Sequence, residues 1–406
     1  MGRVFFPLDE DLALLPGSFS PFLHQCIVRL GTLIPFDQVP EQLAALLGVT
    51  VSRETVRRLT EQAGAAQVAC ETEELRCVPR TDSPVLEEGV VQQLSADGAM
   101  VPLQNGIWAE ARTLAVGIVH QQMGTGGPAA HAHDVSYFSR LCSADDFIDW
   151  AALPLHQRGT EHAQTVVAVS DGAGWLQEFV TAHRPDAVRI LDFAHAAGYL
   201  SQAAQAAFGA GSREAAVWLD EWLTRLKTKP PEETLEAIRQ LPMPSPEAIE
   251  VRTTVLAYLR HRLEQVRYAD FQALGYPIGS GMVESGNKLV VEARMKGAGM
   301  HWQRTNVTPM LALRGVLCSG RWTAAWPRIW RQLARQVRER RHQGRLRRQA
   351  IRAARAAAAK PPPVPGAKRL PPEPPRVVHG RPTEHHCWRR GYDPKRLAAA
   401  TGRAKS

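Results

Sequence analysis

Apolar residues recur with a helical period over most of the chain and with a strand period in the middle of it. Residues 1–85 and 212–272 show only the helical period. Between them, alternating or continuous apolar runs predict five strands, and Asn105-Gly106 predicts a hairpin turn between the first two. The predicted strands cover 90–101, 108–120, 134–141, 165–170 and 187–191, and the predicted helices between and after them cover 143–157, 173–183 and 193–208. This order predicts an α/β core that is interrupted by an all-helical insertion.

The N-terminal region contains a candidate DNA-binding element. Gln42–Gly48 is a short amphipathic run that ends at a glycine, and Ser52 is a good cap for a helix over 53–63. This pattern fits a helix-turn-helix motif with a slightly long turn, and it fits a plain helical hairpin equally well. In either case the outward-facing basic residues of the second helix are Arg53, Arg57 and Arg58.

Basic residues are concentrated at the C-terminus. The whole chain has 49 Lys and Arg against 40 Asp and Glu, a net charge of +9. Residues 326–406 have 22 basic and four acidic residues, or +18, so residues 1–325 sum to −9. The sequence predicts helix over much of 326–358 and a Pro-rich linker over 361–376. With Trp326, Trp330 and Trp388 interleaved, this tail favours nucleic-acid contact over a solvated, unstructured tail.

Other features exclude several classes of protein. No stretch approaches 18 apolar residues and the N-terminus has no secretory pattern, so neither a membrane span nor a membrane partner is expected. The six cysteines form no C-x-x-C pair, which argues against a zinc ribbon and favours reduced thiols in a cytoplasmic protein.

Acidic residues stand at predicted strand ends or helix starts beside small residues. Asp97-Gly98 fits a hairpin turn when taken alone, Asp171 and Asp192 fit helix N-caps, and Glu284 fits the first turn of a helix that Ser280 caps and that runs to about Met295.

Considered together, these acids predict a metal site, which none of the separate explanations includes. In a small α/β core, Asp97, Asp171 and Glu284 would converge on one sheet edge, where they would repel one another unless a divalent cation held them. Mg²⁺ prefers such hard oxygen ligands and takes its remaining ligands from water and phosphate. Two ions about 4 Å apart clamp both oxygens of an in-line phosphoryl displacement.

Several longer motifs identify a family. The sequence resembles the DDE transposases of bacterial insertion sequences, specifically the ISKra-type group, which is related to Mutator-like transposases. The resemblance spans nearly the whole chain and is carried by 5–10, 136–140, 169–176, 183–195 and 275–302. Near the C-terminus, His386-Cys387-Trp388-Arg389 stands where the family suggests a His-Pro-Trp-Arg-like motif.

The resemblance implies a ribonuclease-H-like mixed-sheet core with an all-helical insertion. It implies five parts: a helical, helix-turn-helix-like DNA-binding domain over 1–85, the first part of the core over 86–208, the insertion over 209–274, the return to the core with the catalytic Glu helix over 275–325, and a basic helical and Pro-rich tail over 326–406.

The resemblance also assigns the site residues. Asp97, Asp171 and Glu284 become the catalytic triad that binds two Mg²⁺ or Mn²⁺ ions, and Asp192 with His195 forms a D-x-x-H signature. His195 would orient a phosphate or a metal-bound water, with Asp192 supporting it, although a buried structural histidine fits the sequence equally well. Lys288, Arg294, Lys296 and Trp302 follow Glu284, and we expect them to contact the DNA backbone or stack on bases.

The implied function is transposition. We expect the protein to bind double-stranded DNA at the terminal inverted repeats of an insertion sequence, cut it with water as nucleophile, and join the freed 3′-hydroxyl to target DNA. Paired ends imply at least a homodimer, and the expected location is the bacterial cytoplasm at the nucleoid. The alternatives are a catalytically decayed, transposase-derived DNA-binding protein and a metal nuclease without strand transfer.

Overall fold

The computed structural model describes residues 15, 19–124, 127–358 and 377–383. The chain forms two compact units, 1–341 and 342–406, and each is described by itself. The motif at 5–10, the Pro-rich stretch 361–376 and the segment 386–389, with Trp388, lie outside the described residues. Within the described ranges, no helix is both long enough and apolar enough to cross a bilayer.

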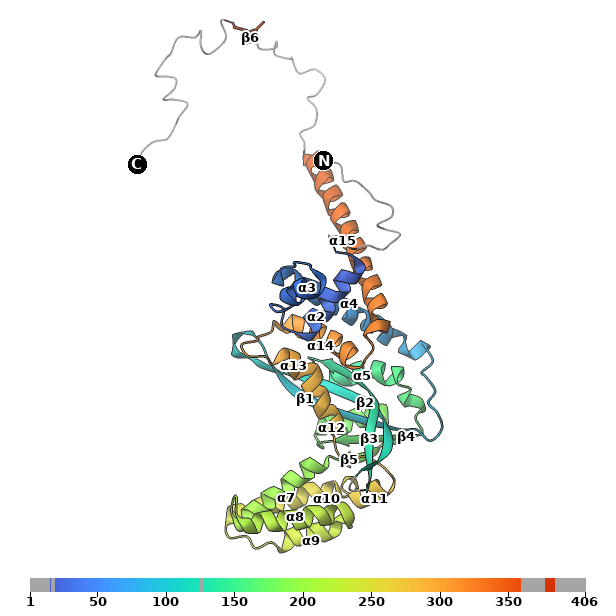
Figure 1. Ribbon diagram of the computed structural model, residues 1–406, viewed down its shortest axis with the longest axis vertical. Coiled ribbons are helices and arrows are strands. Elements are labelled where there is room, and N and C mark those ends of the chain that lie inside the picture. Colours follow the sequence, from blue (N-terminus) through green and yellow to red (C-terminus); the bar gives the residue numbers. More distant parts are fainter. Residues whose placement is uncertain (1–14, 16–18, 125–126, 359–376, 384–406) are drawn as a thin grey trace, which may run out of the picture. The chain divides into compact units, whose positions relative to one another are not determined.

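A five-stranded mixed sheet lies at the centre of the first unit (Figure 1). The strand order is β3-β2-β1-β4-β5, with β1, β4 and β5 parallel and with antiparallel pairing of β2 to both β1 and β3. The strands are β1 (Val91–Pro102), β2 (Trp108–Gly124), β3 (Gly127–Arg140), β4 (Thr165–Ser170) and β5 (Val188–Leu191). All five predicted strands are confirmed, and β2 and β3 are longer than predicted.

The predicted hairpin turn joins β1 to β2. Asn105 and Gly106 both have positive φ, at 63° and 71°. Positive φ at two consecutive turn residues matches the right-handed twist of the paired strands, and Asn-Gly adopts it most readily. The turn prediction is therefore confirmed.

Helices cover both faces of the sheet because the side chains of β1 alternate. Leu94 and Ala96 point to one face, where they pack with α5 (Ala144–Gln157) and α6 (Gly174–His183). On the opposite face, Ala99 and Val101 pack against the helical segment that carries Glu284. On this opposite face, the part of β1 between the two apolar clusters is covered by neither of them and faces a cleft.

The predicted helical insertion is a block of short helices that continues from α7 (Phe193–Phe208). It comprises α8 (Arg213–Thr228), α9 (Pro231–Gln240), α10 (Pro246–His261) and α11 (Tyr268–Ala273). These helices share one apolar core with Val167, Val169 and Ile190 of the sheet. Figure 1 shows the block gathered beside β5, so it lies next to the carboxyl ends of the parallel strands.

The N-terminal helices pack with the last helices of the unit. These are α2 (Pro21–Leu33), α3 (Val39–Leu47), α4 (Arg53–Cys77), α14 (Arg304–Cys318) and α15 (Trp322–Ala358). Ser52 caps α4 as predicted, and α4 runs well beyond the predicted end at Ala63. Trp322 and Trp326 are buried in the core of this helical cluster, and Trp330 packs against it. The expectation that Trp326 serves nucleic-acid contact is therefore wrong, because its ring is buried within the protein. Trp330 is partly exposed, so its contact with nucleic acid stays a prediction.

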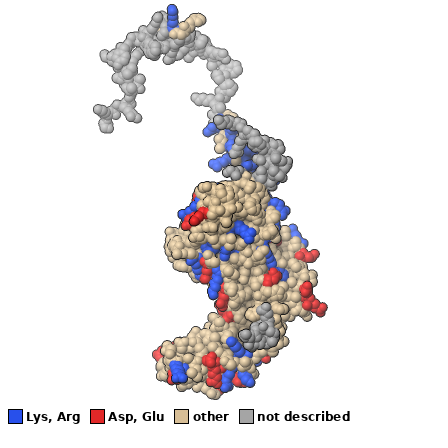
Figure 2. Space-filling model, in the orientation of Figure 1, with Lys and Arg blue, Asp and Glu red and all other residues tan. Residues whose placement is uncertain are grey.

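The second unit begins within α15. From His342 to Ala358 this helix has five arginines and no acidic residue, and its described side chains are nearly all exposed. Figure 2 shows basic side chains gathered at this end of α15. A short hairpin of β6 (Val377–Val378) and β7 (Arg381–Pro382) follows.

Candidate active site

The parallel strands bring two of the predicted acids to the same level of the sheet. Leu94 of β1 pairs with Ala168 of β4. Continuing both strands by three residues places Asp97 level with Asp171, which follows the last residue of β4. Asp192 follows the last residue of β5 and so lies at the same edge.

These acids line one cleft together with the third member of the predicted triad. The cleft has a volume of about 280 Å³. Its lining residues are Ala96, Asp97, Asp171, Asp192, Ala194, His195, Ser280, Val283 and Glu284. In the described chain, no lysine or arginine lines it. The structure thus brings together the five residues that the sequence analysis assigned to catalysis or to its support.

Asp97 lies within β1, opposite Thr113 of β2, so the alternative of a hairpin turn at Asp97 is wrong. Its Oδ1 accepts a hydrogen bond from the Gly98 amide at 2.7 Å, and its Oδ2 accepts one from Asn287 Nδ2 at 2.9 Å. Burial raises the pKa of Asp97, and the negative charges of Asp171 and Glu284 raise it further against these two hydrogen bonds. Asp171 and Glu284 are therefore close enough for their charges to disfavour ionisation of Asp97.

Asp171 and Asp192 are held by backbone amides. Asp171 Oδ1 accepts from the Ala173 amide at 2.9 Å. Asp192 is buried; its Oδ1 accepts from the His195 amide and caps α7, and its Oδ2 accepts from the Ser280 amide. Oδ1 thus confirms the predicted role of Asp192 as a helix cap, while Oδ2 joins the end of β5 to the start of the Glu284 segment.

Glu284 lies in α12 (Gly281–Gly286), followed by a π-helical segment over Asn287–Glu292 and by α13 (Ala293–Met295). The sequence predicted one regular helix capped by Ser280. Instead, the Ser280 hydroxyl makes no cap and donates to Glu284 Oε1 at 3.3 Å. At Gly286 a Cβ atom would lie 2.8 Å from the Tyr137 ring, so only glycine lets this segment approach the sheet closely enough.

Asn287 was missed by the sequence analysis. It is buried, bonds Asp97, and keeps its Oδ1 without a hydrogen-bond partner among the described residues. An unsatisfied buried acceptor normally marks an ordered water or an ion. Its spacing of three residues from Glu284, which puts both side chains on one helical face, was the signal available in the sequence.

His195 lies at the rim of the cleft and is exposed. Its ring contacts the edge of Tyr199 at a centroid separation of 5.4 Å. The alternative of a buried structural histidine is therefore wrong. An exposed imidazole beside carboxylates can exchange protons with water or with a bound phosphate.

The donor set of the cleft fits a hard divalent cation. It offers carboxylate oxygens, it has no basic lining residue, and it has room for the water ligands that Mg²⁺ retains. In the described part of the chain, no three His, Cys, Asp or Glu side chains are already arranged around a metal position. The hydrogen bonds from Gly98, Asn287 and Ala173 instead hold the carboxylates on protein donors.

Arg294 and Trp302 do not occupy the positions expected of DNA contacts. Arg294 is 2% exposed, donates from Nε and Nη2 to the Gly31 carbonyl, and lies over the Phe36 ring. Burial lowers its pKa to about 10, and nearby Arg314 lowers it further. Trp302 is also buried, and its Nε1 donates to the Met295 carbonyl at 3.0 Å. Both side chains therefore serve packing, and the prediction of phosphate or base contacts for them is wrong.

The two lysines of this segment differ in how free they are to contact DNA. Lys288 is exposed and makes no ion pair within the described ranges. Lys296 forms an ion pair with Glu292 at 2.7 Å. Lys288 is thus the freer of the two to meet a phosphate.

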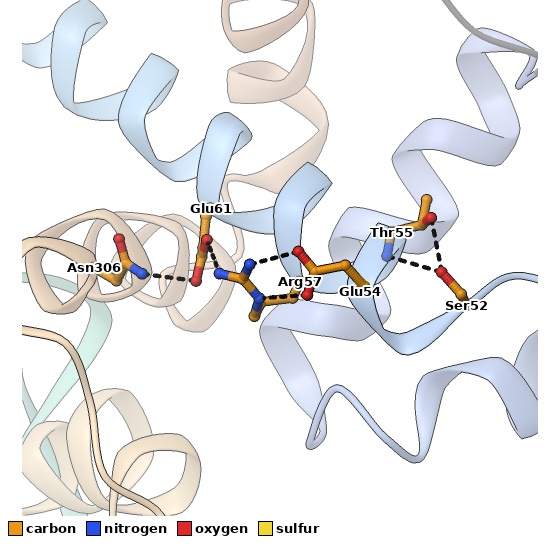
Figure 3. A network of polar contacts seen from close by, with 6 residues as sticks. All are labelled: Ser52, Glu54, Thr55, Arg57, Glu61 and Asn306. Atoms are coloured by element: carbon orange, nitrogen blue, oxygen red, sulfur yellow. Dashed lines mark hydrogen bonds and ion pairs between the residues drawn. The ribbon is translucent and has the colours of Figure 1, made fainter. Parts of the chain in front are cut away.

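The three arginines at the start of α4 also differ. Arg53 and Arg58 are exposed, whereas Arg57 donates to both Glu54 and Glu61 (Figure 3). Glu61 accepts a further bond from Asn306 of α14 at 2.7 Å. The charge of Arg57 is therefore neutralised within the protein, and its contact with DNA is less favoured than that of its neighbours.

Comparison with known proteins identifies a distant relative. No family model matches the chain. The chain is similar to a curated protein described as "UPF0236 protein in vanSb 3'region" from Streptococcus gallolyticus, with 23% identity over 320 residues. The match covers 77% of this chain and 66% of that protein, so the chain spans just under two thirds of the relative's length.

Proposed function

We propose that this chain is a DDE transposase of the insertion-sequence type. It binds the ends of its element, cleaves the phosphodiester bond there, and transfers the 3′-hydroxyl ends to target DNA. The observation that carries the proposal is the convergence of Asp97, Asp171 and Glu284 on one acidic cleft. The strand order, with β1 central and its acid level with the end of β4, supports a ribonuclease-H-like core.

Divalent ions, when bound in the cleft, activate the attacking oxygen and stabilise the leaving oxygen of an in-line displacement. Asp97, Asp171 and Glu284 would hold them. Asp192 places Glu284 by binding the Ser280 amide, and Asn287 orients Asp97. The exposed His195 is placed to orient a phosphate or to exchange a proton at the cleft rim.

Basic side chains without an ion-pair partner in the described part of the chain are the candidates for DNA binding. Arg53 and Arg58 on α4 and Lys288 beside Glu284 supply candidates in the first unit, and the arginine-rich end of α15 supplies more in the second. Neutralising phosphates releases counterions, so we expect binding to weaken steeply with salt. Two element ends in one reaction favour at least a dimer.

A catalytically decayed DNA-binding protein is the second candidate. The observation that favours it is that the described carboxylates are bonded to protein donors rather than gathered around a metal position. The two candidates differ in whether DNA is cut.

A cleavage assay separates them. Purified full-length protein would be incubated with labelled DNA that carries the element's terminal repeat, with Mg²⁺ or with EDTA. We expect cutting and joining that require Mg²⁺, loss of both to background in Asp171→Asn, and DNA binding unchanged in that variant. Asp149→Asn, an exposed acid on α5, is the matched control and should cut normally. Binding without metal-dependent cutting by the wild type would establish the decayed alternative, and cutting without joining would indicate a nuclease.

A further inference from the structure

The helical block holds the carboxyl ends of two sheet strands by tyrosine hydroxyls. Tyr258 of α10 donates to the carbonyl oxygen of Asp171, just after β4, at 2.9 Å. Tyr268 of α11 donates to the carbonyl oxygen of Leu191, the last residue of β5, also at 2.9 Å. Each contact therefore fixes the backbone at or directly before an acid of the cleft, Asp171 in one case and Asp192 in the other.

Two neighbours lock Tyr258 in place. Arg262, which directly follows α10, donates from Nη2 to the Gly172 carbonyl at 2.8 Å, and its guanidinium lies 3.8 Å from the centre of the Tyr258 ring. On the other side Tyr199 stacks on Tyr258, with ring centroids 4.0 Å apart and an interplanar angle of 18°. Consecutive carbonyls, those of Asp171 and Gly172, are thus held by one rigid pair of side chains.

The loop after β4 has a residue that suits this pair. Gly172 has φ +79°, and a Cβ there would lie 2.6 Å from Tyr258 Oη and 2.8 Å from Arg262 Nε. Any larger residue would displace both donors. Glycine at this position therefore allows both the backbone turn and the close approach of α10.

The second contact reaches the third acid through a chain of bonds. Tyr268 holds the end of β5, and Asp192, the next residue, binds the Ser280 amide. The Ser280 hydroxyl in turn donates to Glu284. Tyr258 thus acts on the position of Asp171, while Tyr268 acts on the position of Glu284.

We infer that Tyr258, Arg262 and Tyr268 are positioning residues through which the helical block sets the separation of Asp171 and Glu284 for a divalent cation. The inference rests on the proposed function, because it presumes that the cleft holds the cation. On this account the block is part of the metal site's support, and its removal would loosen the site even where the sheet stays folded.

Mn²⁺ binding tests the inference without any DNA reaction. Full-length protein would be titrated with Mn²⁺ while the free ion is measured by electron paramagnetic resonance. We expect Tyr258→Phe and Tyr268→Phe each to weaken binding about tenfold, the lower end of what loss of a supporting contact around a metal site costs. The matched control is Tyr276→Phe, since Tyr276 packs on the same core and its hydroxyl makes no hydrogen bond within the described chain. Its affinity should equal that of the wild type.

The outcomes are distinguishable. If Asp171→Asn binds as much Mn²⁺ as the wild type, or if neither protein binds any, both the proposed function and this inference are overturned. Wild-type binding that Asp171→Asn removes, with full affinity in Tyr258→Phe, would overturn the inference alone. A purely structural role predicts a lower free energy of unfolding with unchanged Mn²⁺ affinity, so urea unfolding of each metal-free variant completes the test. Should Tyr268→Phe fail to fold, the less buried Tyr258→Phe decides.

Discussion

Acidic side chains gather both in the cleft and along helix α4, but only those along α4 have basic partners within the described chain. Along α4, Glu71 forms an ion pair with Arg140 of β3, and Glu74 forms one with Arg328 of α15. In the cleft, Asp97, Asp171 and Glu284 face one another without a basic lining residue in the described chain. Like charges gathered without a partner cost folding free energy, so the cleft is where a ligand of opposite charge is expected, and α4 is where charge serves the fold.

The largest change in stability expected from this contrast comes from breaking a buried ion pair of α4. Arg140→Met leaves Glu71 buried and unpaired, and should lower the free energy of unfolding by about 3–5 kcal/mol. Urea denaturation measures it. The control is Arg225→Met, which breaks a half-exposed pair with Glu221 and should cost less than about 1 kcal/mol. Equal losses in the two variants would show that the Glu71–Arg140 pair is no more important than a surface pair.

His24 makes the stability of the helical cluster around α4 sensitive to acid. It is buried against the Trp326 and Trp330 rings, and burial, followed by the charge of Arg58 on α4, lowers its pKa from 6.5 to about 4. The unfolded chain therefore binds a proton that the folded one does not, and stability falls as pH falls from 6.5 towards 4. Between pH 7 and pH 4.5 the loss should be about 2–3 kcal/mol. His24→Phe, compared with the wild type by urea unfolding at both pH values, should remove most of it; an unchanged loss would contradict the assignment.

The contribution of the cleft to the free energy of unfolding should change with pH in the opposite direction. Because the pKa of Asp97 is raised, the folded state keeps that proton to higher pH than the unfolded state, so stability contributed by Asp97 is lost as pH rises above 3.8. The slope from one group is at most about 1.4 kcal/mol per pH unit. Asp97→Asn should flatten the pH dependence of unfolding in EDTA, and Mn²⁺ should reverse the slope in the wild type only. Identical profiles for both proteins would mean that neither burial nor the neighbouring carboxylates raise the pKa of Asp97.

The smallest effect compares paired with unpaired arginines on α4. Arg58→Gln should weaken binding to terminal-repeat DNA and reduce the slope of log affinity against log salt by about 1, as loss of one phosphate contact does. Arg57→Gln should leave the slope unchanged, because Glu54 and Glu61 already hold that side chain. Fluorescence anisotropy at several salt concentrations distinguishes them. Equal slopes in both variants would remove α4 from the DNA interface.

The sequence allowed the sheet and the cleft to be predicted because their signals are local. Five strands followed from apolar spacing, and Asn105-Gly106 marked the hairpin. The acids at strand ends could be brought to one edge by topology alone. The helix predicted over 193–208 has the same bounds as α7 for the same reason: an N-cap acid at its start and Gly209 after its end.

Burial and helix irregularity could not be predicted in the same way. Arg294 and Trp302 were expected to face DNA because their residue types suit it, but the π-helical segment before Arg294 changes which face it presents. Trp326 lies in a basic run, so charge concealed the apolar spacing of Trp322, Trp326 and Ile329. Tyr258 and Arg262 act through contacts between distant segments, which no spacing along the chain reveals. Asn287 could have been suspected from its spacing to Glu284, but its bond to Asp97 could not.

Anomalous diffraction from a crystal soaked in Mn²⁺ tests the central claim most directly. We predict a manganese peak in the cleft whose protein ligands are carboxylate oxygens of Asp97, Asp171 and Glu284, at the roughly 2 Å separations typical of small hard cations. An empty cleft at saturating Mn²⁺, or manganese bound only away from these three residues, would contradict the account.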